Sequence, residues 1–107
     1  MPVYNKLIRD KIPDIIRKEG KKFNIRTLND IEYENELLKK FIEECQELVH
    51  AKKENEKLEE LADIFELMYA FLDLKNISIS QLDELRKQKS TKRGGFSNKV
   101  FLIDVED

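Results

Sequence analysis

Two long apolar patterns with the period of an α-helix place the strongest constraint on how this chain can fold. In residues 30–52, apolar side chains such as Tyr33 and Leu37 recur every three or four positions, and residues 55–74 repeat the pattern from Leu58 onward. This spacing predicts two helices, each with one apolar face. Only a few polar residues separate the two segments, so the helices are expected to pack as antiparallel neighbours.

Shorter helices are expected on either side of this pair. Pro13 and Gly20 bracket a helix at about residues 13–19, since proline suits the first turn of a helix and glycine the residue after its last turn. Ser78 or Ser80 is expected to cap a further helix, at about 80–91. The apolar, β-prone tail at 99–105 is expected to be extended.

These elements predict one all-α domain over residues 1–107, an antiparallel helical bundle with short extended N- and C-terminal segments. Charged residues make up 39% and hydrophobic residues 40% of the chain, which is enough apolar material for a folded protein. No stretch approaches the roughly 18 apolar residues of a membrane span, and the first residues do not resemble a signal peptide. We therefore expect a cytoplasmic protein that binds no membrane.

Two acidic residues of segment 55–74 are in unexpected places for a simple amphipathic helix. With successive residues about 100° apart, Glu60 falls between Leu67 and Phe71, inside the apolar arc. Asp63 lies at the edge of the arc, whereas Glu59 and Glu66 point toward solvent. One carboxylate is thus predicted inside the helix pair and a second at its margin.

The same anomaly occurs in segment 30–52 with the same spacing. Glu44 falls between Tyr33 and Leu37 in the apolar arc, and Glu47 lies three residues later at its edge. A buried carboxylate without a partner is costly, or becomes protonated, so facing pairs of this kind favour a bound cation. Oxygen ligands suit Mg²⁺, or Mn²⁺, better than zinc. Two alternatives are a Lys or Arg partner for each buried acid, or helix rotations that leave the acids at a wet boundary.

Charge is strongly segregated although the net charge is only −2. Residues 1–26 carry eight Lys and Arg against three acids, residues 30–66 carry thirteen acids against five bases, and residues 86–99 carry six bases and no acid. Solvated helix faces would explain this pattern, and so would a site that binds a cation and a polyphosphate together. A protein that binds duplex nucleic acid is more often basic overall, so that partner is not expected.

Four short stretches together resemble a known superfamily. Residues 43–47, EECQE, and residues 60–63, ELAD, are similar to the paired acidic signature of the MazG-like, all-α nucleoside triphosphate pyrophosphatases. Residues 4–16, YNKLIRDKIPDII, and residues 92–96, KRGGF, resemble the smaller phosphoribosyl-ATP pyrophosphohydrolase-like group within it.

The resemblance implies a magnesium-dependent enzyme that cleaves nucleotides between the α and β phosphates, giving a monophosphate and pyrophosphate. Carried over by position, Glu44, Glu47, Glu60 and Asp63 match the metal-binding acids. Glu43 matches the first acid of the signature, where it would orient a ligand or a lysine. All five are the expected catalytic residues. The resemblance also implies a homodimer or homotetramer.

Bases in the two framing motifs are the expected phosphate ligands, with arginine offering two parallel donors and lysine a point charge. They are Lys6, Arg9, Lys11, Lys92 and Arg93.

Three functions are compatible with these residues. The leading interpretation is a pyrophosphatase acting on canonical or modified (d)NTPs, because the YNKLIRDKIP opening is more similar to relatives other than the histidine-biosynthesis enzyme. The second is phosphoribosyl-ATP pyrophosphohydrolase itself. The third is a non-catalytic helical binding or oligomerisation module. The acids inside both apolar arcs disfavour this third interpretation, because a simple helical bundle does not require them.

Overall fold

The computed structural model describes residues 2–107, and its regular structure is entirely helical. In this part of the chain the order is α1 (Ile12–Lys18), α2 (Asp30–His50), α3 (Glu54–Leu74) and α4 (Ile79–Arg93), with no strand. The predicted all-α class is confirmed, and each helix begins and ends within two residues of its expected bounds. The tail at 99–105 holds neither helix nor strand, so its β-prone composition does not produce pairing here.

The chain divides into two compact units. Of the first unit, Met1–Asn76, the structure describes residues 2–76, which include α1, α2 and α3; the second, Ile77–Asp107, holds α4 and the tail. The prediction that residues 1–107 form one domain stays a prediction. No helix in residues 2–107 combines the length and the apolar character needed to cross a membrane.

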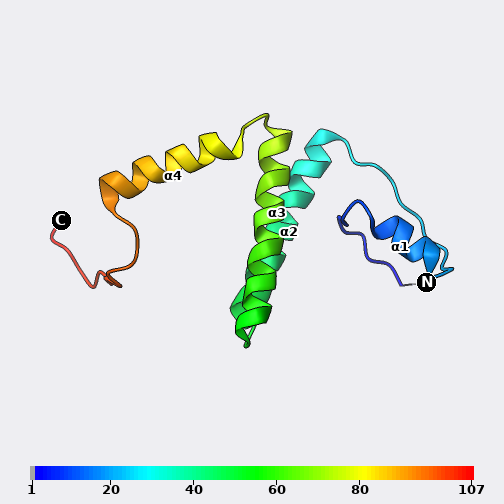
Figure 1. Ribbon diagram of the computed structural model, residues 1–107, viewed down its shortest axis with the longest axis horizontal. Coiled ribbons are helices and arrows are strands. Elements are labelled where there is room, and N and C mark those ends of the chain that lie inside the picture. Colours follow the sequence, from blue (N-terminus) through cyan, green and yellow to red (C-terminus); the bar gives the residue numbers. More distant parts are fainter. Residues whose placement is uncertain (1) are drawn as a thin grey trace. The chain divides into compact units, whose positions relative to one another are not determined.

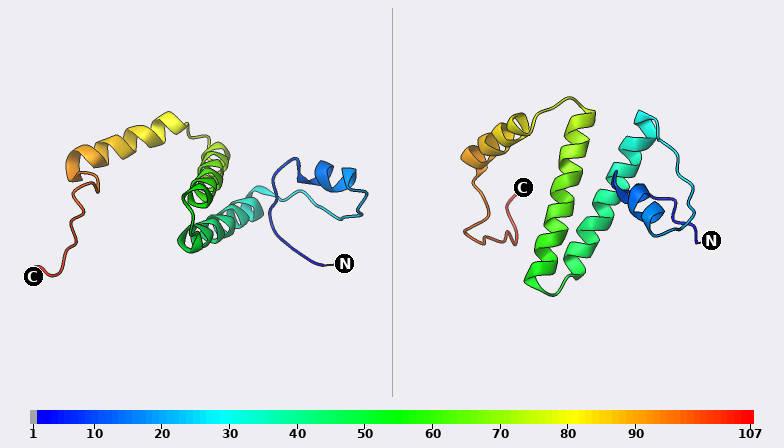
Figure 2. Two further views of the ribbon diagram at one scale, coloured as in Figure 1. Left: turned by 60° about the horizontal axis from the view of Figure 1, so that its bottom comes forward. Right: turned by 45° about the vertical axis from the view of Figure 1, so that its right-hand side comes forward.

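The first unit is built on α2 and α3, which run antiparallel along their length (Figures 1 and 2). A connection of three residues, 51–53, joins them. Because this connection is so short, the chain reverses direction and the two helices pack as antiparallel neighbours. The contact buries Leu37 of α2 together with Leu67 and Leu72 of α3. These leucines lie on the apolar arcs that the sequence predicts.

Local hydrogen bonds fix where α2 begins. The Asn29 side chain accepts a bond from the backbone N–H of Glu32 at 2.9 Å, and the Glu32 carboxylate accepts one from the N–H of Asn29 at 3.4 Å. This reciprocal capping satisfies two N–H groups that the first turn would otherwise leave free. Arg26 donates two bonds to the same Glu32 carboxylate, at 3.2 and 2.7 Å, which ties the preceding loop to the helix start.

An ion pair between Lys75 and Glu34 joins the other end of α3 to the first part of α2. With the short connection at one end and this pair at the other, the register of the two helices is restrained at both ends.

Leu37 should be a main contributor to the stability of the helix pair, because only 2% of its surface is exposed. We predict that Leu37→Ala lowers the free energy of unfolding by about 2–5 kcal/mol, through lost apolar burial and the cavity left behind. Ile31→Ala, on the same helix but 78% exposed, serves as the control and should lose well under half as much. Urea unfolding followed by circular dichroism measures both, and equal losses would contradict the packing described.

Candidate metal and phosphate site

Glu44 is the acid that α2 buries against α3. Only 7% of its surface is exposed, and its position two turns after Leu37 places it on the same stripe of the helix. Its Oε2 atom is inaccessible and has no hydrogen-bond partner. A buried, unpartnered carboxylate oxygen is rare in a native protein and calls for a ligand or a proton.

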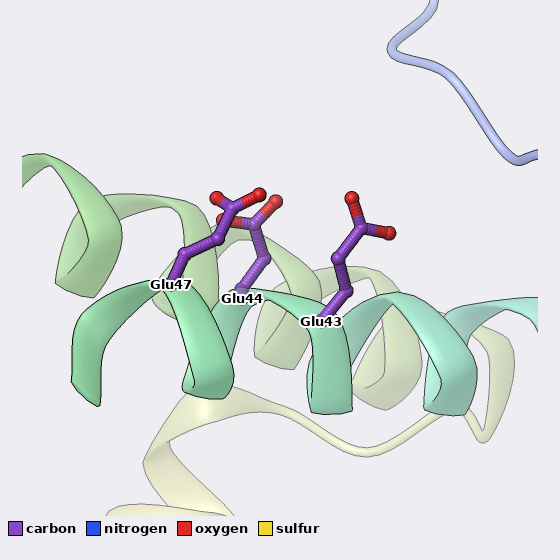
Figure 3. A group of neighbouring side chains, drawn as sticks. All are labelled: Glu43, Glu44 and Glu47. Atoms are coloured by element: carbon purple, nitrogen blue, oxygen red, sulfur yellow. The ribbon is translucent and has the colours of Figure 1, made fainter. Parts of the chain in front are cut away.

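The neighbouring acids gather around Glu44 in two overlapping groups. One is Glu43, Glu44 and Glu47 of α2, and the other is Glu44 with Glu60 and Asp63 of α3; in each group, one oxygen from every residue lies within 4.8 Å of the others. Figure 3 shows the three α2 side chains rising from the same side of the helix, with the carboxylates of Glu44 and Glu47 next to each other. The structure thus brings together all five acids that the sequence singles out.

Glu60 repeats the condition of Glu44 from the opposite helix. Its side chain is half-buried, and its Oε2 is also inaccessible and without a hydrogen-bond partner. Two oxygens without partners therefore lie on facing helices. They belong to the two carboxylates that the sequence predicts inside the apolar arcs. The alternative in which a Lys or Arg pairs with each buried acid is not found: in residues 2–107, neither Glu44 nor Glu60 forms an ion pair.

Burial and crowding together change the proton affinity of Glu44. Desolvation, followed by the nearby carboxylates of Glu60 and Glu47, raises its pKa from an ordinary 4.5 to about 8. At neutral pH and without a cation, Glu44 is therefore mostly protonated. A divalent cation at this position would reverse the balance, because it favours the ionised form.

The donor set fits a hard divalent cation. The groups are all carboxylates, they come from two helices, and two of their oxygens have no other partner. Mg²⁺ and Mn²⁺ take oxygen ligands of this kind, whereas the thiolates and imidazoles that zinc prefers are not part of either group. The residues placed to hold a cation are Glu44, Glu47, Glu60 and Asp63.

A pocket of about 350 Å³ opens beside these acids. Its lining includes the acids Glu44, Asp63 and Glu66 together with the bases Lys6, Arg9 and Lys40. The N-terminal segment that precedes α1 supplies two of the bases, and α2 supplies the third. Acids and bases meet here as expected for a site that takes a cation together with an anionic ligand.

One ion pair spans the pocket. Arg9 donates through Nη2 to Oδ1 of Asp63 at 2.6 Å, which links the N-terminal segment to α3. The predicted phosphate ligand and the predicted metal ligand are thus in direct contact.

The other predicted phosphate ligands lie elsewhere. Lys11 is exposed and is not among the residues that line this pocket in the described part of the first unit. Lys92 and Arg93 occupy the last turn of α4, in the second unit, and are exposed. Their phosphate-binding role rests on the sequence motif alone and stays a prediction.

Two pocket residues were missed by sequence reasoning. Lys40 precedes Glu44 by four residues, the spacing at which helical side chains share a face, so this signal was present. Glu66 was assigned to solvent; it is exposed but also lines the pocket, three residues after Asp63. The N-terminal segment that completes this lining has no helical period from which its position could be predicted.

An all-α unit with carboxylates facing each other across an antiparallel helix pair is the arrangement expected of the MazG-like, all-α nucleoside triphosphate pyrophosphatases. Residues 5–89 match the family model of phosphoribosyl-ATP pyrophosphohydrolase, a family within that superfamily. The match covers most of the chain and contains every acid of the site, so the chain belongs to this family. Comparisons with curated proteins and with solved structures give no match. The family supports pyrophosphohydrolase activity, a hydrolysis of phosphoric anhydrides.

The raised pKa of Glu44 predicts an unusual pH dependence of stability in the metal-free protein. Because its folded-state pKa, about 8, lies above the unfolded value of 4.5, the folded protein holds this proton more tightly than the unfolded chain does. Its contribution to stability is therefore full below about pH 4.5, falls as the pH rises toward 8, and changes no further above that. Melting temperatures measured in chelator between pH 5 and 9 should fall accordingly.

Two glutamine variants check this prediction. Glu44→Gln cannot ionise, so its melting temperature should vary less with pH across this range. Glu59→Gln, which removes an exposed acid of α3, should keep the wild-type dependence. If Glu44→Gln melts with the wild-type pH profile, Glu44 does not carry the effect.

Proposed function

We propose that the protein is a magnesium-dependent nucleotide pyrophosphohydrolase that cleaves a (d)NTP between its α and β phosphates, releasing a monophosphate and pyrophosphate. The observation that carries this proposal is the pair of buried, unpartnered oxygens on Glu44 and Glu60, which face each other from α2 and α3. Such oxygens are stabilised by a divalent cation, and the family supplies the anhydride chemistry.

In this mechanism the four carboxylates of Glu44, Glu47, Glu60 and Asp63 would hold Mg²⁺. When bound, the cation would neutralise charge on the polyphosphate and lower the pKa of a water that attacks phosphorus. Glu43 lies beside this group and is half-buried, so it is placed to orient that water or to accept its proton.

The bases of the pocket provide the complementary half of the site. Lys6, Arg9 and Lys40 line the pocket together with the acids, where they would bind phosphate oxygens and offset the charge of the substrate. Lys40 is fixed on a helix, whereas the other two lie on the segment before α1. The anhydride would then contact both the cation and these bases.

Phosphoribosyl-ATP is a second candidate substrate, because the matched family model carries its name. It contains the same kind of anhydride bond and needs the same two halves of the site. A substrate panel that includes phosphoribosyl-ATP with the canonical (d)NTPs separates the two functions: preferential hydrolysis of phosphoribosyl-ATP would replace the first proposal by the second.

Removal of one carboxylate tests the metal chemistry. We predict that Glu60→Gln lowers pyrophosphate release by at least about 100-fold, since loss of even a supporting contact to a metal costs 10- to 100-fold. The exposed neighbour Glu59→Gln is the matched control and should retain wild-type turnover. Wild-type activity should also require added Mg²⁺ and disappear in chelator. A Glu60→Gln enzyme with full activity would contradict the assignment.

We also propose that a second copy of the chain covers the apolar surface of the helix pair. Ile42, Leu58, Leu61 and Phe65 are each between 49% and 68% exposed, which is a large apolar surface for two helices that bury few residues of their own. A homodimer or homotetramer would bury it.

Sedimentation velocity tests the assembly. Leu58→Glu should shift the wild-type oligomer toward monomer, because it places a charge in the covered surface. Leu102→Glu, at an exposed position of the tail, is the control and should sediment like wild type. A monomeric wild-type protein would contradict the proposal.

A further inference from the structure

The ion pair between Arg9 and Asp63 competes with metal binding if Asp63 is a metal ligand. The 2.6 Å bond places a positive guanidinium on the carboxylate that, with Glu44 and Glu60, forms one of the two groups described above. A guanidinium and a divalent cation on the same carboxylate repel each other and compete for its oxygens. Binding of the cation by Asp63 therefore weakens its bond to Arg9.

The Arg9 side chain can leave Asp63 at little cost in free energy. Its side chain is 58% exposed, and that of Asp63 is 38% exposed, so the pair is weakened by water and its loss costs little. Arg9 also lies on the irregular segment before α1, where a change of side-chain direction disrupts no helix. The buried oxygens of Glu44 and Glu60, by contrast, have no base to release.

A released guanidinium has a nearby alternative. Arg9 lines the same pocket as Lys6 and Lys40, where the nucleotide phosphates are proposed to bind. Its planar group can donate two parallel bonds to a phosphate, which is a better match than a single bond to Asp63.

We propose that Arg9 exchanges partners: it holds Asp63 in the absence of the cation and turns to the substrate phosphate when the cation takes Asp63. This inference rests on the proposed function and adds a role for one residue, which couples the two binding events. Cation binding frees Arg9 and so raises the affinity for the polyphosphate, and by linkage the polyphosphate raises the affinity for the cation.

Calorimetry of Arg9→Gln, with Mg²⁺ and with inorganic pyrophosphate as the probes, tests the exchange without turnover. Without its competitor, Asp63 should bind Mg²⁺ about two- to fivefold more tightly, the range expected from breaking an exposed ion pair. Pyrophosphate should bind at least about tenfold more weakly in the presence of Mg²⁺, because charge-assisted bonds to phosphate are lost. In the wild type, saturating Mg²⁺ should tighten pyrophosphate binding more than it does in the variant.

Two further variants control for charge and for folding. Arg9→Lys keeps the positive charge but not the two parallel donors, so its Mg²⁺ affinity should stay near wild type while pyrophosphate binding weakens. Arg17→Gln removes an exposed arginine that is paired with Asp14 at the same 2.6 Å in α1, and neither affinity should change. If Arg9→Gln fails to fold by circular dichroism, Arg9→Lys decides alone: pyrophosphate binding as tight as in the wild type would overturn the exchange.

The outcomes separate this inference from the proposed function. Weaker Mg²⁺ binding by Arg9→Gln would overturn the exchange, since it would mean that Arg9 positions Asp63 for the metal. Unchanged affinities in both Arg9 variants would overturn it as well. A wild-type protein that hydrolyses no nucleotide would overturn the proposed function, yet the affinities would still decide on the exchange; a wild-type protein that binds no Mg²⁺ would overturn both.

Discussion

The contact on which the structure depends is the burial of the Glu44 carboxylate between α2 and α3. A helix pair that buried only leucines would be more stable and would need no ligand. Here the same surface that packs Leu37 against α3 also holds a carboxylate with an unpartnered oxygen, and Glu60 adds a second from the facing helix. These unpartnered oxygens lower the stability of the folded protein, as is common at sites that bind a ligand.

The raised pKa of Glu44 expresses this cost in chemical terms. Protonation removes the buried charge when no cation is present, and a cation replaces the proton when it binds. The surrounding bases do not remove the cost, since Arg9 pairs with Asp63 at the margin and not with either buried oxygen. The pocket therefore combines a buried acid, Glu44, with an exposed margin at which acids and bases lie together.

Much of the helix pair could be predicted from the sequence, because periodicity decides which residues share a face. The position of Glu60 between Leu67 and Phe71 on the wheel was enough to identify it as misplaced, and the same construction identified Glu44. The bases of the N-terminal segment could not be placed in this way, because Lys6 and Arg9 precede α1 in a segment with no period. Only the tertiary structure shows that Arg9 pairs with Asp63 and that Lys6 lines the same pocket. Lys40 was missed although its spacing from Glu44 was readable. The acidic pattern also did not specify anhydride chemistry, which came from the family motifs.

The connection of three residues between α2 and α3 has a consequence for how the acidic centre forms. Glu44 lies six residues before the end of α2 and Glu60 six residues after the start of α3. The two buried oxygens therefore belong to residues only sixteen positions apart in the sequence. The entropy lost in closing so short a loop is small, and contacts of low sequence separation form early in folding. The acidic centre can therefore assemble within a single helical hairpin, before Lys6 and Arg9 of the N-terminal segment are in place.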